Sequence, residues 1–292
     1  MSFFKAIKTD SKKALRSNRT KSCAIAFLYL AVHFLFFSLY KLLFELLGIP
    51  HYFFYFNPLD SSSFLPSFSP SYIFFFIGYL LVNLLAVIPL YLGIKKWFFF
   101  LGGGSSKSIT SVFYFFSSFK AYIKSMGLFL NVAIRKLFWS SIFIFIPYLA
   151  SEYLIFSISK TNPLIFSGAS GKVMLFSLIA LKFIIVIIGS AIAFYLFSAY
   201  FCAPYYMARD GLSSFKAINL SKKAVKGEKF EIFKFKLSFI LYDALRIFVL
   251  PIIYVLPYKE TSFSLYARFL MEKLERESSI STPLPSEANN IL

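Results

Sequence analysis

The chain has 292 residues, of which 58% are hydrophobic and 21% aromatic, and its mean hydropathy is +0.71. These values exclude an ordinary soluble globular domain and predict a membrane protein. The net charge of +18 does not indicate a nucleic-acid partner, because the basic residues stand at the ends of long apolar runs. Cys23 and Cys202 are isolated in the sequence, which excludes a disulfide scaffold and a C-x-x-C site.

The first apolar run, residues 23–47, follows a basic leader. It is longer than the apolar core of a secretory signal peptide and lacks a small-residue cleavage site, so we predict a retained first span. Other runs reach the ~20 apolar residues that cross a bilayer as a helix; they are residues 72–94, 137–157, 177–203 and 234–256. A sixth candidate, residues 252–272, is interrupted by Pro257 and by charged residues.

Basic residues alternate from loop to loop. Segments 1–22 and 95–136 each carry seven Lys or Arg and segment 204–233 carries six, whereas loop 48–71 has none and loop 158–176 has two. Because cytoplasmic loops carry the excess of Lys and Arg, the N-terminus is predicted to lie inside. With six spans the C-terminus is inside as well, and the predicted location is the cytoplasmic membrane.

The stretch SSFKAINLSKKAVKG, residues 213–227, predicts a basic amphipathic helix. Its lysines gather on one side, and apolar side chains gather on the other. One hypothesis is an interfacial helix on an anionic leaflet; the alternative is a solvated connector whose charges only set topology. The candidate lipid-binding residues of this segment and of the N-terminus are Lys5, Lys12, Lys13, Lys216, Lys222, Lys223 and Lys226.

This stretch recurs in the chain. SFFKAIKTDSKKALR at residues 2–16 aligns with residues 213–226, and SSFKAYIKSMG at residues 117–127 is a weaker third copy. Each copy precedes a pair of apolar runs. The predicted fold is therefore an all-α transmembrane bundle of about six spans in three hairpins, each entered by a basic amphipathic helix. Residues 1–274 are predicted to form one domain, and the polar tail 275–292 is predicted to be disordered.

The segment from about residue 200 to residue 266 carries a family resemblance. The residues concerned are Ala203, Pro204, Tyr205, Ala208, Asp210, Leu220, Ser221, Gly227, Lys229, Phe233, Leu237, Ser238, Phe239, Pro257, Tyr258, Thr261 and Tyr266. At these positions the chain resembles an uncharacterised family of small polytopic bacterial membrane proteins, a domain of unknown function. It is also distantly similar to the membrane domain of glycerophosphodiester phosphodiesterases. The resemblance implies a six-helix protein of the bacterial cytoplasmic membrane and brings no catalytic residues.

Ionisable residues inside the apolar runs are candidate functional groups. Asp243 and Arg246, where the chain departs from the family pattern, lie three residues apart and are expected to pair on one helix face. The pair is either structural or part of a polar transport path. His33 is either a satisfied interior residue or a ligand. Lys41 is expected to pair with Glu45 or to snorkel to the interface, and Lys182 is expected to snorkel. Gly189 and Ala193 form a small-xxx-small step that predicts close helix packing.

Enzyme motifs fail on spacing. SGASGKV at residues 167–173 lacks the first glycine and the Ser or Thr of a phosphate loop. LGGGSSKS at residues 101–108 is either an anion cradle or a flexible turn. The chain has no zinc-protease or nucleophile-elbow motif, so we expect neither an enzyme nor a cofactor nor a metal.

The sequence therefore predicts a non-enzymatic scaffold or an accessory to envelope or transport machinery. The expected partners are anionic phospholipids and another membrane protein, with no nucleic acid. The alternative is a small transporter or permease component with a polar path near Asp243 and Arg246.

Overall fold

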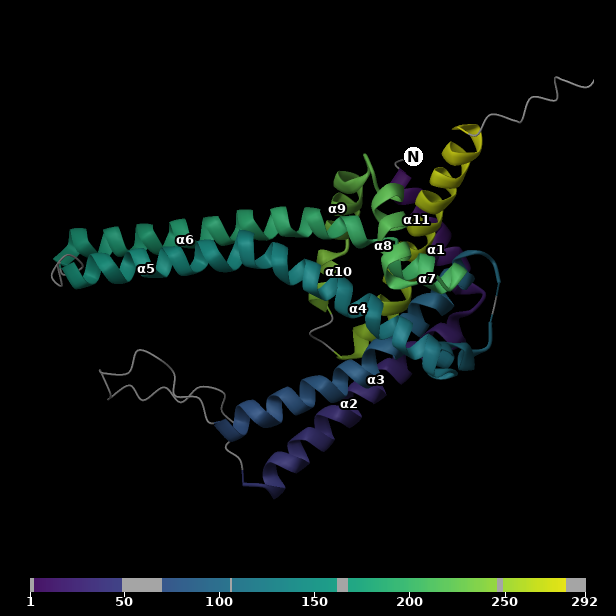
Figure 1. Cartoon of the computed structure of the whole chain (residues 1–292), viewed down its shortest axis with the longest axis horizontal. Helices are drawn as coiled ribbons and strands as arrows, with labels where there is room; N and C mark the ends of the chain where they lie inside the picture. Colours follow the sequence, from purple (N-terminus) through teal and green to yellow (C-terminus); the bar gives the residue numbers. More distant parts are fainter. Residues whose placement is uncertain (1–2, 49–69, 106, 162–167, 246–248, 282–292) are drawn as a thin grey trace, which may run out of the picture. The chain divides into compact units, whose positions relative to one another are not determined.

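The computed structural model describes residues 3–48, 70–105, 107–161, 168–245 and 249–281, and within these ranges it contains helices and no strand (Figure 1). The all-α fold class predicted from the apolar runs is confirmed. The chain forms two compact units. Unit 1 consists of Met1–Met126 and Tyr242–Leu265, and unit 2 consists of Gly127–Leu241 and Tyr266–Leu292.

The helices of unit 1 are α1 (Phe3–Arg16), α2 (Arg19–Leu46), α3 (Pro70–Gly102), the 3-10 helix η1 (Ile109–Phe116) and the start of α4 (Phe119–Ser140). Those of unit 2 are the rest of α4, the π-helical turn η2 (Ser141–Phe145), α5 (Ile146–Thr161), α6 (Gly168–Phe197), the 3-10 turn η3 (Ser198–Tyr200), α7 (Ala203–Asp210), α8 (Ser214–Ala224) and α9 (Lys229–Leu237). Helices α10 (Ile240–Ala244) and α11 (Val249–Ser281) contribute to both units. Because α11 continues to Ser281, residues 275–281 of the predicted tail are helical, and residues 282–292 lie outside the described residues.

Four helical stretches are long and apolar enough to cross a membrane. They are Arg19–Leu46, Phe76–Gly102, Phe119–Ile158 and Gly168–Asp210. These stretches contain or overlap the first four predicted spans, so those four candidates are confirmed in length and apolar composition. The sequence predicts six spans in three hairpins, whereas the part of the chain that the structure describes gives these four.

The predicted fifth span, residues 234–256, is not a single helix. Helix α9 ends at Leu237, and α10 begins at Ile240 after a short turn. In that turn the hydroxyl of Ser238 donates to the carbonyl oxygen of Phe235 at 2.7 Å, which offers the backbone an alternative to helical hydrogen bonds. Helices α9 and α10 have 9 and 5 residues, fewer than the ~20 that cross a bilayer.

The core of unit 1 forms where α2, α3 and η1 meet. The buried residues of this core are Ile25, Leu90, Ile94, Trp97, Phe98, Leu101 and Val112. The backbone of η1 approaches α3 at Gly93, where an added Cβ would overlap the carbonyl oxygen of Val112. Trp97 is 1% exposed, so it belongs to this core, although its position at the end of a span is typical of an interfacial tryptophan.

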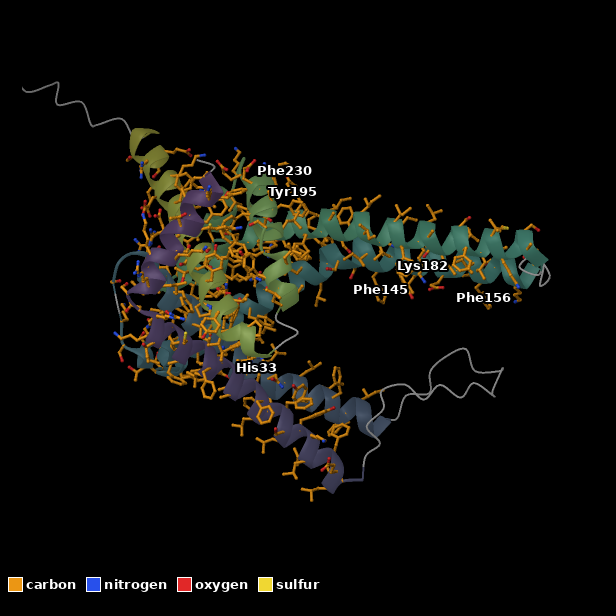
Figure 2. The ribbon with its side chains drawn as sticks, turned by 180° about the vertical axis from the view of Figure 1, so that it is seen from behind. His33, Phe145, Phe156, Lys182, Tyr195 and Phe230 are labelled. Carbon is orange, nitrogen blue, oxygen red and sulfur yellow. The ribbon has the colours of Figure 1, made fainter. Side chains whose placement is uncertain are left out.

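The hairpin of unit 2 pairs α4, η2 and α5 with α6. At the π-helical turn an added Cβ on Gly189 would overlap the carbonyl oxygen of Phe143, and Ala193 is fully buried, so the small-residue packing predicted here is confirmed. Phe145 and Phe156 are 61% and 56% exposed and point outward from the hairpin in Figure 2, as side chains that face lipid do.

Lys182 of α6, which is predicted to snorkel, has an acidic partner on the neighbouring helix. Its ammonium group forms an ion pair with the carboxylate of Glu152 on α5 and lies 4.4 Å from the ring centroid of Tyr148. The charge is therefore neutralised within the hairpin, which lowers the cost of holding it beside the apolar helices.

Gly93→Ala tests the close approach of η1 to α3. Because the added methyl group must displace the Val112 backbone, we expect the free energy of unfolding to fall by about 1–3 kcal/mol. Gly78→Ala in the same helix is the matched control, since nothing lies within 4 Å of an added Cβ there, and it should be neutral or slightly stabilising. Unfolding in mixed micelles by SDS titration measures both, and equal effects would contradict the described packing.

Candidate functional site

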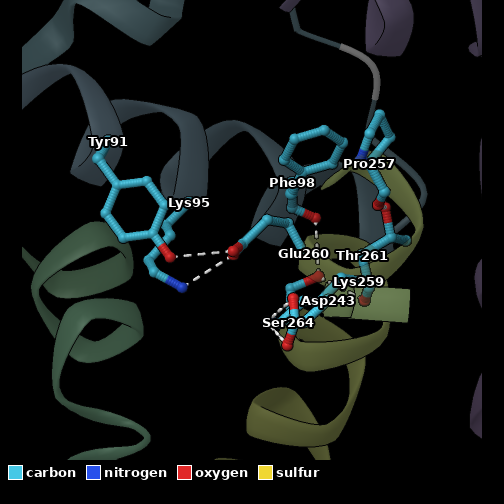
Figure 3. A network of polar contacts seen from close by, with 9 residues as sticks. All are labelled: Tyr91, Lys95, Phe98, Asp243, Pro257, Lys259, Glu260, Thr261 and Ser264. Carbon is cyan, nitrogen blue, oxygen red and sulfur yellow. Dashed lines mark hydrogen bonds and ion pairs between the residues drawn. The ribbon is translucent and has the colours of Figure 1, made fainter. Parts of the chain in front are cut away.

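A buried polar cluster joins α3 to α11 in unit 1 (Figure 3). Glu260 of α11 is only 2% exposed. Its carboxylate accepts a hydrogen bond from the Lys95 ammonium group at 2.8 Å and another from the Tyr91 hydroxyl at 3.0 Å. The lysine also lies 4.8 Å from the centroid of the Tyr91 ring. Both charges are thus paired and hydrogen-bonded, which is the condition under which an ion pair is tolerated in an interior.

Hydroxyl groups on α11 hold it closely against α3. Pro257 removes one backbone donor inside α11, and the Thr261 hydroxyl donates to the Pro257 carbonyl oxygen at 2.8 Å. The fully buried Ser264 hydroxyl lies 3.0 Å from the Phe98 carbonyl oxygen of α3 and 2.8 Å from the Thr261 carbonyl oxygen of its own helix, and its one proton is shared between these two acceptors (Figure 3). A Cβ on Gly102 would lie only 3.2 Å from Ser264 Oγ, so glycine permits this approach. These contacts fix Glu260 beside Lys95.

Asp243 pairs with Lys259 of α11. Its carboxylate accepts two hydrogen bonds from the Lys259 ammonium group, at 2.7 and 2.6 Å. The Asp243 and Lys259 side chains are 36% and 17% exposed, so this pair is less buried than Lys95–Glu260. Arg246, the predicted partner of Asp243, lies outside the described residues.

His33 and Lys41 lie on α2 in the roles that the structural hypotheses predict. The Nδ1–H of His33 donates to the Tyr29 carbonyl oxygen at 2.9 Å, and the two rings are 4.2 Å apart between centroids. The Lys41 ammonium group lies 3.7 Å from the Glu45 carboxylate one turn along the helix. Neither residue joins the Glu260 cluster.

The predicted lysine-bearing helices α1 and α8 both form. Lys5, Lys12 and Lys13 on α1 are exposed, as are Lys216 and Lys222 on α8. The further exposed lysines at the end of this segment are Lys223 and Lys226. Helix α8 begins after Ser213 and ends at Val225, and Gly227 takes a left-handed conformation with φ of 82°.

The apolar side of α8 is covered by protein. Ala217, Ile218 and Val225 are 0–1% exposed. The buried Ser221 hydroxyl donates to the Ala199 carbonyl oxygen at 2.9 Å and accepts from the Cys202 amide at 3.1 Å, which fixes α8 to η3 and the start of α7. These three residues of α8 are therefore unavailable for insertion into lipid, and the lysines of α8 face outward from a packed helix.

The repeated serine is buried in each copy of the repeat. Ser11, Ser125 and Ser221 are all 0% exposed. In α1 the Ser11 hydroxyl donates to the Ile7 carbonyl oxygen at 2.7 Å, whereas in α8 the serine bonds to a neighbouring element. The sequence similarity therefore extends to burial of one residue, although its hydrogen-bond partner differs.

Ion pairs in unit 2 attach the C-terminal half of α11 to segment 204–233. The Arg209 guanidinium lies 2.6 Å from the Glu275 carboxylate and also pairs with Asp210 at 2.7 Å. The Lys273 ammonium donates to the Glu228 carboxylate at 2.7 Å. That hydrogen bond holds the pKa of Lys273 above its usual value, because it favours the charged form.

The first half of α11 contacts the N-terminal segment of unit 1. The Lys12 ammonium lies 5.7 Å from the Tyr258 ring centroid, and the Arg19 guanidinium lies 5.9 Å from the Tyr254 ring centroid. Sequence reasoning missed this role of α11 and the Glu260 cluster. The signal in the sequence was Glu260, a single glutamate between two apolar runs. Sequence reasoning interpreted this glutamate only as an interruption of the predicted span 252–272.

The composition of these clusters gives no sign of metal chemistry. Among the described residues, no three His, Cys, Asp or Glu side chains lie close enough together to hold a metal ion. What the geometry provides is paired charge in the interior and exposed lysines on two helices.

Comparison with protein families agrees with an uncharacterised membrane protein. The family model described as protein of unknown function (DUF975) matches residues 1–273 of the chain. The chain belongs to the DUF975 family. No curated protein and no solved structure matches this DUF975 protein. The distant similarity to the membrane domain of glycerophosphodiester phosphodiesterases therefore stays a prediction.

Glu260→Gln tests how much the buried cluster of this DUF975 protein contributes. Because the substitution leaves the Lys95 charge buried without its counter-charge, we expect the free energy of unfolding to fall by about 3–5 kcal/mol. Asp243→Asn breaks the more exposed pair and should cost below about 1 kcal/mol. SDS titration in mixed micelles measures both variants, and a cost for Asp243→Asn equal to that for Glu260→Gln would contradict the difference in burial.

Proposed function

We propose that this DUF975 protein is a non-enzymatic integral membrane protein of the cytoplasmic membrane, a scaffold or an accessory to envelope or transport machinery. The observation that carries the proposal is the arrangement of α8, whose apolar side is packed on protein and whose lysines are exposed. Such a helix presents positively charged side chains whose backbone is held in place by the packed core of unit 2. Each Lys or Arg near an anionic leaflet contributes about 1 kcal/mol of attraction.

Attraction by charge alone replaces the interfacial insertion considered from the sequence. An inserted helix needs a free apolar side, and Ala217, Ile218 and Val225 of α8 are buried by protein. The exposed lysines of α1, namely Lys5, Lys12 and Lys13, act in the same way on unit 1. The expected partners are anionic phospholipids and a further membrane protein that the scaffold holds.

The proposed topology has four spans and both termini inside. The second half of α11 pairs with Arg209 and Glu228, in a segment whose lysine content predicts the cytoplasmic side. Its first half contacts Lys12 and Arg19 of the basic N-terminal segment, which is also predicted inside. If both segments are cytoplasmic, α11 begins and ends on one side. A helix with both ends on the same side does not cross the bilayer, and we therefore propose four spans without α11.

Transport is the second candidate function. The observation that favours it is the Lys95–Glu260 pair at the end of a candidate span, since ionisable groups within membranes often mark ion or substrate pathways. The polar path predicted near Asp243 is less favoured, because Lys259 already neutralises that carboxylate.

A fluorophore on α8 tests the proposed engagement of anionic lipid. Asn219→Cys is exposed and can be labelled in a Cys23→Ser background, because Cys202 is buried. In nanodiscs that contain phosphatidylglycerol, we expect headgroup-attached quenchers to reduce the fluorescence more than in pure phosphatidylcholine. High salt should remove the difference, since ions screen the attraction.

Two variants control this measurement. Replacing Lys216, Lys222, Lys223 and Lys226 by Gln should abolish the phosphatidylglycerol effect, and replacing them by Arg should preserve it. Equal quenching in the Gln variant would contradict the proposal. Proteoliposomes loaded with a pH-sensitive dye test the transport candidate, because protein-dependent acidification that is lost in Glu260→Gln would favour transport over a scaffold.

A further inference from the structure

The first three amides of the turn after α3 are used in hydrogen bonds within the protein. The amides of Gly103 and Ser105 donate to the Phe100 carbonyl oxygen at 3.0 and 3.1 Å, and the amide of Gly104 donates to the Leu101 carbonyl oxygen at 3.0 Å. These donors are therefore occupied. The cationic groups that this turn offers to an anion are the side chains of its lysines.

Two lysines at this turn have aromatic neighbours in place of acidic ones. The Lys96 ammonium lies 3.0 Å from the centroid of the Tyr114 ring, and the Lys107 ammonium lies 3.4 Å from the centroid of the Phe100 ring. Within the described residues neither lysine forms an ion pair with a carboxylate, although the adjacent Lys95 does. Phe100 lies one helical turn after Lys96 in α3, so the Lys107 ammonium over its ring lies on the side of the helix that carries Lys96, and the two positive charges repel each other.

The positions of both lysines are fixed by the core of unit 1. Trp97, which is 1% exposed, donates its indole N–H to the Lys107 carbonyl oxygen at 3.2 Å. This bond holds the turn against α3. Both lysine side chains are half-buried, so the repulsion between them is screened less than it would be in open water. Two cations held together without a counter-charge form a site that an anion would stabilise.

Exposed aromatic rings lie on η1, the helix that contributes Tyr114, and at the start of the next helix. In η1 the side chains of Val112 and Phe115 are buried, whereas Phe113 and Phe116 are 44% and 43% exposed. Phe119, at the start of α4, is 80% exposed. Aromatic rings exposed at the end of a membrane-spanning helix are typical of the headgroup level of a bilayer. The surroundings of the lysines therefore suit a lipid better than a soluble anion.

We infer that Lys96 and Lys107 together bind the phosphate of a phospholipid headgroup, with the exposed rings of Phe113, Phe116 and Phe119 beside its acyl chains. The two ammonium groups supply charge-assisted hydrogen bonds to the phosphate oxygens. The bound anion relieves the repulsion between them. The site is separate from α1 and α8. It binds a single lipid molecule, whereas the lysines of α1 and α8 attract the anionic leaflet as a whole.

Titration of the full chain with dioctanoyl phosphatidylglycerol tests the site. In phosphate-free detergent solution, native mass spectrometry should show one saturable lipid. Lys96→Gln/Lys107→Gln should weaken this binding at least tenfold, and Lys96→Arg/Lys107→Arg should retain most of it. Lys160→Gln/Lys172→Gln is the control for net charge, because it removes the same charge from two exposed lysines elsewhere in the chain and should leave the binding unchanged.

Three outcomes would overturn the assignment. The first is unchanged lipid binding in Lys96→Gln/Lys107→Gln, provided that its thermal unfolding matches that of the wild type. The second is an equal loss in the Lys160→Gln/Lys172→Gln control, which would mean that only net charge matters. The third is saturation by inorganic phosphate at the concentration at which the lipid saturates, because the ligand would then be free phosphate.

Discussion

The buried ion pair between Lys95 and Glu260 is the interaction on which the arrangement of unit 1 depends. A carboxylate that is 2% exposed is stable only with its counter-charge and hydrogen-bond donors in place, and Lys95 and Tyr91 supply them. This requirement fixes α11 against α3. With α11 in that position, Ser264 reaches the Phe98 carbonyl oxygen, and a Cβ at Gly102 would crowd the side chains of Ser264 and Leu265.

Neighbouring lysines at the end of α3 have different electrostatic roles. Lys95 is neutralised by Glu260 and belongs to the interior. Lys96, one residue later, points to Tyr114 and shares its surroundings with the positive charge of Lys107. The face of α3 that carries Lys95 therefore packs against α11, and the adjacent face carries Lys96, which we propose binds a ligand. Because a helix turns by 100° per residue, adjacent lysines reach these two environments.

The sequence predicted those features that depend on local pattern. Apolar runs of about 20 residues identified the first four spans, and the lysine spacing of residues 213–227 identified α8 and its exposed side. The small residues Gly189 and Ala193 identified a close packing contact. In each case the residues that determine the structure lie within a few turns of one another.

The features that the sequence did not predict depend on contacts between distant residues. Glu260 lies 165 positions from Lys95 in the sequence. In a hydropathy window such a glutamate only lowers the mean hydropathy of a candidate span. The same window counts residues 234–256 as one apolar run, although the turn at Ser238 divides them. The contact of Asp243 with Lys259 was not predicted either, because local spacing gives no sign of a lysine 16 residues away.

We propose as the central claim that α11 stays on the cytoplasmic side, where Glu260 pairs in its first half and Lys273 and Glu275 pair in its second half. Cysteine labelling at residue 254 tests it most directly, since Tyr254 is 60% exposed and would lie near the outer surface if residues 234–256 and 252–272 both crossed the membrane. In a Cys23→Ser background, with Lys172→Cys as the control for the predicted outer side, an impermeant maleimide should label Tyr254→Cys only after the membrane is permeabilised. Labelling of Tyr254→Cys in sealed spheroplasts, at the rate of the Lys172→Cys control, would contradict the four-span topology.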